Sequence, residues 1–130
     1  MKEYVMMWKR AFDFAGRSRR REFWIPWLIN NLIGVFLWSR IFSAVFGTGG
    51  GGTFFFYTIV ILGLALIIPS IALSVRRLHD IGYSGAWLLI WFLPFGLIVI
   101  LIFHIMDGTP GPNRYGEDPK GRKPFIPPTA

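Results

Sequence analysis

The sequence contains no cysteine, and charged side chains are scarce. Asp and Glu together number 7 of 130 residues, and charged residues of both signs make up 16%. The absence of cysteine excludes disulfide bonds, thiolate metal sites and cysteine nucleophiles. The scarcity of charge, together with 53% hydrophobic residues, excludes a small soluble domain, because such a domain needs a polar shell around its core.

Long apolar stretches take up about half of the chain. They cover residues 23–46, 54–75 and 85–106. Each reaches the length of about 20 residues that an α-helix needs to cross a hydrocarbon core roughly 30 Å thick. The sequence therefore predicts an all-α membrane protein with three transmembrane helices, organised as a single membrane domain over residues 1–130.

The flanking segments differ from the spans in composition. Residues 1–22 contain seven basic and three acidic side chains, a net charge of +4 directly before the first apolar stretch. This is the positive-inside pattern, which places the N-terminus in the cytoplasm and explains the basic charge without nucleic acid. The apolar positions of 1–14 have helical spacing and predict a short amphipathic helix. The tail, residues 107–130, holds six of the nine prolines and is expected to be irregular.

The third apolar stretch has two interpretations, because Pro94 and Gly96 interrupt it near its midpoint. A single kinked span places the tail in the periplasm, opposite the N-terminus. A re-entrant hairpin that turns at Pro94-Phe95-Gly96 returns the tail to the cytoplasm. We favour the single span, since the basic residues of the tail are too far from the membrane to weigh strongly on orientation.

Ionisable side chains gather at the ends of the spans that the charge pattern assigns to the cytoplasm. The candidate site residues there are Arg17, Arg19, Glu22, Arg76, Arg77, His79 and Asp80. Asp80 follows Arg76 by four positions and Arg77 by three, so a continued helix would let it pair with either guanidinium. These charges form either a structural network that fixes the helix ends or a site for an anionic headgroup or phosphate.

No cofactor or metal is expected. His79 has no set of other ligands at metal-binding spacing around it. His104 and Asp107, three positions apart, could form a proton-handling pair, although a helix cap or a solvated pair is the commoner role for such residues.

Three blocks of the sequence carry a resemblance to a known family. They are FAGRSRRREFW at 14–24, SVRRLHDIGYSG at 74–85 and GTPGPNRYGEDP at 108–119. In this order and spacing they resemble the DUF805 family of small bacterial inner-membrane proteins. The resemblance implies a helical protein of the bacterial inner membrane, without an established activity. It also supplies a candidate tail motif, consisting of Asn113, Arg114, Gly116, Asp118 and Pro119.

The functional expectation is a non-enzymatic protein that works by assembly, as a homo-oligomer or with a larger membrane partner, and that contacts anionic lipid headgroups through its arginines. One alternative is a small oligomeric channel or transporter whose pathway runs along Asn30, Asn31, Arg40 and the kinks at Pro69 or Pro94. A lipid-phosphate enzyme that uses His79 and Asp80 is less favoured, because adjacent helical positions diverge by about 100 degrees. With three spans, the tail motif would lie across the membrane from the other candidate residues.

Overall fold

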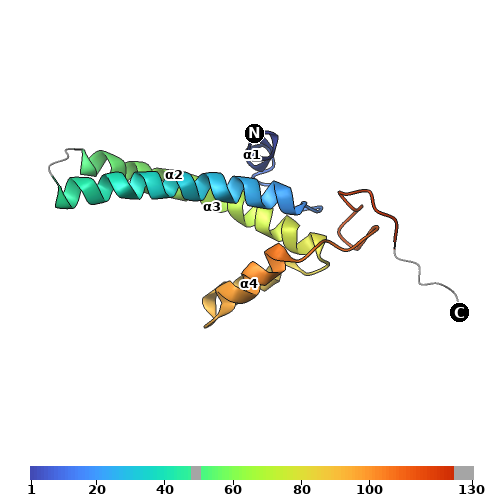
Figure 1. Ribbon diagram of the computed structural model, residues 1–130. Coiled ribbons are helices and arrows are strands. Elements are labelled where there is room, and N and C mark those ends of the chain that lie inside the picture. The colour runs from blue at the N-terminus through green and yellow to red at the C-terminus, as the bar shows by residue number, and fades with distance from the viewer. Residues whose placement is uncertain (48–50, 125–130) are drawn as a thin grey trace, which may run out of the picture.

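The computed structural model describes residues 1–47 and 51–124, and within them the regular structure is helical. The elements in chain order are α1 (Lys2–Lys9), α2 (Arg20–Phe46), α3 (Gly52–Asp80), the 3-10 helix η1 (Gly85–Phe92) and α4 (Gly96–Ile105). The long helices α2 and α3 lie side by side, α1 packs near the first turns of α2, and α4 lies beside the last turns of α3 (Figure 1). The all-α prediction is confirmed.

The helices α2 and α3 are long and apolar enough to cross a membrane. They contain 27 and 29 residues, and most of their large apolar side chains are exposed in a single chain, as expected where lipid is the solvent. The helix α3 continues five residues beyond the predicted end of its apolar stretch. This continuation places Arg76, Arg77 and Asp80 in its last turns.

The third apolar stretch is not one helix, so the prediction of a single kinked span over 85–106 is not confirmed. It consists of the eight-residue η1 and the ten-residue α4, joined by a turn in which the N–H of Gly96 donates to the carbonyl of Leu93 at 2.9 Å. Phe95 adopts a left-handed φ of 63°. A side chain at position 96 would place its Cβ 1.7 Å from the carbonyl oxygen of Ile90, so only glycine fits. The chain path agrees with the hairpin alternative.

A small apolar core lies where α1, α2 and α3 meet. Met7, Phe23 and Leu73 are buried there. Tyr4 donates a hydrogen bond from its hydroxyl to the side-chain oxygen of Asn30 at 3.1 Å, which ties α1 to α2. Asn30 therefore anchors the N-terminal helix, and this contact gives no support to its role in a channel pathway.

Candidate functional site

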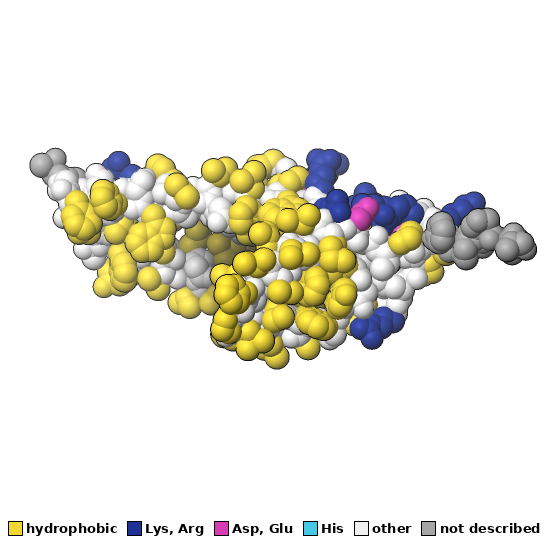
Figure 2. Space-filling model, turned by 60° about the horizontal axis from the view of Figure 1, so that its bottom comes forward, with side chains coloured by type: hydrophobic (Ala, Val, Ile, Leu, Met, Phe, Trp, Pro, Cys, Tyr) yellow, Lys and Arg dark blue, Asp and Glu magenta, His cyan; other side chains and the backbone are white. Residues whose placement is uncertain are grey.

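Buried charges gather at one end of the molecule, where the chain before α2, the end of α3 and the tail meet. We call this group the cap network and define it as Arg17, Arg76, Arg77, Asp80 and Asp118, all buried. Exposed basic side chains gather around the same end, beside the tail (Figure 2). The network thus combines residues from all three sequence blocks.

Asp80 is the acceptor at the centre of the cap network. Arg17 donates from Nε to Asp80 Oδ1 at 2.9 Å, and Arg77 donates from Nη1 to Asp80 Oδ2 at 2.7 Å. The three side chains are at most 2% exposed. The predicted pairing of Asp80 with Arg77 is confirmed. An ion pair buried this deeply needs further hydrogen bonds to offset the loss of water.

Arg17 supplies those further bonds by reaching the tail. Its Nη1 donates to the carbonyl of Gly111 at 2.7 Å, and its Nη2 donates to the carbonyl of Thr109 at 2.6 Å. The same Nη2 lies 3.8 Å from Asp118 Oδ1. One guanidinium therefore joins the segment before α2, the end of α3 and the tail.

The tail motif lies together with the other two blocks, and the expectation that it lies across the membrane from them is not confirmed. A side chain that contacts Asp80 and Gly111 at hydrogen-bond distance places both at the same end of the molecule. The physical reason is the hairpin turn before Gly96, which brings α4 back toward the end of α3.

Arg76 holds the linker between α1 and α2. It donates from Nε to the Ser18 hydroxyl at 3.2 Å and from Nη1 to the carbonyl of Arg10 at 2.8 Å and to the carbonyl of Asp13. Ser18 returns a bond from its own N–H to the Arg76 carbonyl at 3.1 Å. Arg76 does not pair with Asp80, because its guanidinium is directed to the linker.

The tail motif docks on the last turn of α3. Asn113 donates from its side-chain amide to the carbonyl of His79 at 2.9 Å. The His79 ring stacks on Tyr115 with 3.8 Å between ring centroids. The Arg114 guanidinium lies over the Tyr115 ring, 4.7 Å from its centroid. His79 thus packs against the tail, and its Nδ1 lies 3.2 Å from the carbonyl oxygen of Gly16.

Asp118 organises the end of the described tail. Burial acts to raise the pKa of Asp118, but the hydrogen bonds from Arg122, with Nε at 2.8 Å, and from the backbone N–H of Lys120 outweigh it and hold the pKa well below its ordinary value of 3.8. A hydrogen bond from Lys120 likewise lowers the pKa of Asp107. Both carboxylates therefore remain ionised in the docked tail at neutral pH.

Some candidate residues lie outside the cap network. Arg19 is exposed, and the Glu22 carboxylate accepts a hydrogen bond from the Arg19 backbone N–H at 3.3 Å, where it caps α2. The carbonyl of Gly116 accepts a longer bond from Arg17 at 3.4 Å. Pro119 is half-buried. The His104 and Asp107 pair does not form, since His104 contacts the carbonyl of Ile100 and Asp107 contacts Lys120.

Residue-type reasoning missed several contributors. Thr109 and Gly111 act through their backbone carbonyls, which no side-chain pattern reveals. Gly108 is needed because a Cβ there would lie 2.1 Å from Asp80 Oδ2. All of these residues lie inside the three sequence blocks, as does Ser18. The blocks as whole motifs therefore pointed to these segments, although the individual residue types did not.

The cap network holds separate segments of the same chain together. The donors of Arg17, Arg76 and Arg77 are directed at acceptors of the same chain. Among the described residues no group of three or more His, Asp and Glu side chains is placed to hold a metal ion. Anionic ligands would have to meet the exposed basic residues around the network.

The fold and the network define a small helical membrane protein with a buried arginine-aspartate cap. The family described as "Protein of unknown function (DUF805)" matches residues 11–117, and the chain belongs to this family. It is 40% identical to the inner membrane protein YhaI of Escherichia coli K12, over 92% of this chain and 97% of that protein. It is 36% identical to the inner membrane protein YhaH of the same strain, over 90% and 95% of the two chains. No solved structure matches the chain.

Proposed function

We propose that this protein is a non-enzymatic assembly protein of the inner membrane, in which α2 and α3 span the bilayer and the η1–α4 segment forms a re-entrant hairpin. Both the N-terminal segment and the tail then lie in the cytoplasm. The carrying observation is the contact of Arg17 with Asp80 and with the carbonyls of Thr109 and Gly111. The positive-inside charge of residues 1–22 supports the cytoplasmic side for this cap.

The division between buried and exposed basic residues supports a role for the cap in contacting anionic headgroups. The buried arginines hold the chain together. The exposed basic residues at the same end are Lys2, Lys9, Arg19, Arg21, Arg114, Lys120 and Lys123. Each basic side chain near an anionic leaflet is worth about 1 kcal/mol of attraction, so this surface would hold the cap on the membrane.

The exposed side of α2 supports assembly with a second copy of the chain. Asn31 is exposed on this helix, and a polar side chain in a lipid-facing helix favours a protein neighbour.

Cysteine cross-linking in native membranes tests this assembly, because the chain contains no cysteine of its own. Asn31→Cys should give a cross-linked dimer under mild oxidation. Ile33→Cys, two positions along the same helix and half-buried, is the matched control and should give little. Equal cross-linking at both positions, or none at either, would contradict self-assembly through this face.

Lipid analysis tests the contact with headgroups. The purified protein in polymer-bounded membrane particles should retain more phosphatidylglycerol than the variant Arg19→Gln/Arg21→Gln. The variant Arg40→Gln, near the far end of α2, is the control that removes a charge elsewhere. An unchanged lipid ratio in the double variant would overturn the headgroup contact.

A further inference from the structure

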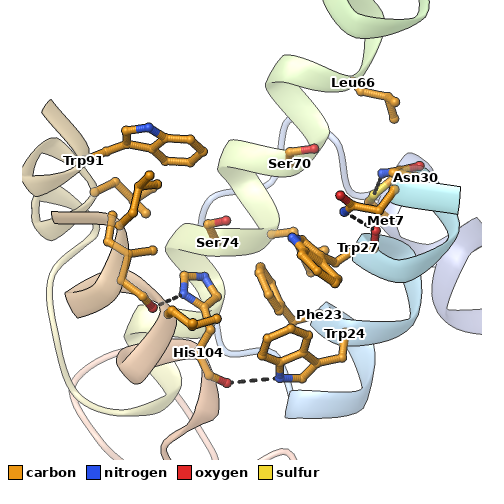
Figure 3. A pocket seen from close by; sticks show the side chains of 16 residues that line it. Met7, Phe23, Trp24, Trp27, Asn30, Leu66, Ser70, Ser74, Trp91 and His104 are labelled. Atoms are coloured by element: carbon orange, nitrogen blue, oxygen red, sulfur yellow. Dashed lines mark hydrogen bonds between the residues drawn. The ribbon is translucent and has the colours of Figure 1, made fainter. Parts of the chain in front are cut away.

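A cavity of about 430 Å³ lies between α2, α3 and the η1–α4 hairpin. Its walls are mainly aromatic and aliphatic, with Trp24 and Trp27 from α2, Leu66 from α3, and Trp91 and Leu97 from the hairpin. Figure 3 shows the labelled side chains around it, and in Figure 2 the surface is hollowed beside the hairpin, where it meets the long helices. The volume lies within the range of about 300–1,000 Å³ that is typical of small-molecule sites.

One wall of the cavity carries an unpartnered buried nitrogen. His104 is 2% exposed, and within the described residues its Nε2 has no hydrogen-bond partner. Its Nδ1 lies 2.6 Å from the carbonyl oxygen of Ile100. A carbonyl accepts only, so Nδ1 carries the proton and donates. In the neutral ring Nε2 then presents a lone pair, and a buried acceptor without a donor is costly.

Two serines place further polar groups in the same cavity. Ser70 and Ser74 line it from α3, and Figure 3 shows them one helical turn apart on the side where the His104 ring lies. Their hydroxyls both donate and accept, so they suit the oxygen of a ligand whose proton goes to a nearby acceptor. The ligand group that fits this end of the cavity is thus a hydroxyl.

We propose that this cavity binds an uncharged lipid alcohol, whose hydroxyl donates to Nε2 of His104 and whose apolar chain lies among Trp91, Leu97 and Leu101. An anionic headgroup or a cation would lose its hydration against the apolar walls. Ser70 lies ten positions before Asp80, about 15 Å along the helix axis from the cap. The depth of the cavity in the membrane rests on the proposed function. In its two-span arrangement, a ligand enters the cavity from the bilayer.

The test uses tryptophan fluorescence in lipid nanodiscs, with 12-bromododecanol as the quenching probe and 1-bromododecane as the probe without a hydroxyl. Three of the six tryptophans line the cavity. The alcohol should quench saturably, to a limit of about half the emission, and it should bind about three- to tenfold more tightly than the alkane, as one hydrogen bond to a neutral acceptor predicts. Equal, unsaturable quenching by both probes overturns the proposal.

Variants locate the effect. His104→Phe keeps an aromatic ring near Phe23, whose centroid lies 4.0 Å from that of His104, but it removes the acceptor, and it should abolish the preference for the alcohol. Leu97→Phe should block both probes by filling the cavity. Ile98→Phe, the next position on α4 and outside the lining, should bind like the unchanged protein. An alcohol preference that survives in His104→Phe overturns the role of Nε2.

Imidazole nitrogen resonances give a readout that does not depend on quenching. The chain has two histidines, so the Nε2 signal of His104 is assigned by comparison with His104→Phe. Dodecanol should shift this signal and dodecane should not. Competition between bromododecanol and either a diacylglycerol or a polyprenol then distinguishes the two sources of lipid alcohol, and displacement by neither overturns the assignment to a lipid. Failure of these tests leaves the cross-linking result unaffected, so the two proposals fail separately.

Discussion

Arg17 and Asp80, 63 positions apart in the chain, form an ion pair of 2.9 Å in which both side chains are almost fully buried. The pair joins the segment before α2 to the end of α3. Arg17 also donates to the carbonyls of Thr109 and Gly111, so the docking of the tail depends on Arg17 as well.

Removal of the Arg17 side chain should therefore release the tail. Arg17→Ala leaves Asp80 with a buried charge that is only partly compensated, which costs about 3–5 kcal/mol. Trypsin should cleave after Arg114 or Lys120 much faster than in the unchanged protein, and the thermal midpoint in detergent should fall. Arg21→Ala is the control, because its 77% exposed side chain forms only a surface pair with Glu3. Equal cleavage of the two variants would contradict the role of Arg17.

A double-mutant cycle should show that the two charges depend on each other. Arg17→Gln leaves Asp80 paired with Arg77 alone, and Asp80→Asn leaves Arg17 and Arg77 without the carboxylate they share, so each should destabilise the cap strongly. The double variant removes both charges, and its destabilisation should be smaller than the sum of the single effects by about 1–3 kcal/mol. Thermal or denaturant unfolding in detergent measures these effects. Additive effects would show that the pair is not coupled.

Gly108 should tolerate no side chain. In Gly108→Ala the new Cβ would lie 2.1 Å from Asp80 Oδ2, so the carboxylate or the tail has to move, at a cost of about 1–3 kcal/mol. Faster tail proteolysis and a lower thermal midpoint report this movement. The matched control is Gly63→Ala in α3, where nothing lies within 4 Å of the new Cβ. A destabilisation by Gly63→Ala as large as that by Gly108→Ala would refute the steric explanation.

Docking of the tail should weaken in acid. The folded-state pKa of Asp118 is lowered, chiefly by its hydrogen bond from Arg122 against the opposing effect of burial. The stabilisation is therefore fully present above the ordinary pKa of 3.8 and is lost as the pH falls through the lowered value. Hydrogen exchange of the tail amides, after correction for the intrinsic rate, should be slow at pH 8 and should speed up below about pH 4. Burial lowers the pKa of His79, which stacks on Tyr115, so its protonation adds a smaller change below the ordinary pKa of 6.5.

Asp118→Asn is the control for this titration. It removes the ionisable group, so tail exchange should be faster at neutral pH and should change less on acidification. An Asp118→Asn protein with the same acid transition as the unchanged chain would assign the transition to other groups.

Hydropathy predicted the two long helices because their apolar length exceeds what the bilayer requires, and the charge pattern predicted which ends gather the arginines. Hydropathy did not predict the break between η1 and α4 in the third apolar stretch. There the turn depends on the left-handed Phe95 and on the close approach of Gly96 to the Ile90 carbonyl. Hydropathy averages over such local geometry, although Pro94 and Gly96 pointed to the hairpin as an alternative.

The candidate site was predicted in part. The i,i+3 spacing of Arg77 and Asp80 predicted their pairing, since it follows from helix geometry alone. The partners of Arg17 could not be predicted in this way, because Thr109 and Gly111 accept through backbone carbonyls that every residue carries. Only the three motifs, taken as units, brought these segments to attention.

The central claim is that the tail lies on the same side of the membrane as the N-terminal segment. The absence of cysteine makes single-cysteine labelling direct, with Glu117→Cys in the tail, Lys2→Cys as the N-terminal reference and Thr53→Cys at the start of α3 as the opposite reference. A membrane-impermeant maleimide applied to intact spheroplasts should label Thr53→Cys alone, and in inside-out vesicles it should label the other two. Labelling of Glu117→Cys in intact spheroplasts, together with Thr53→Cys, would contradict the account.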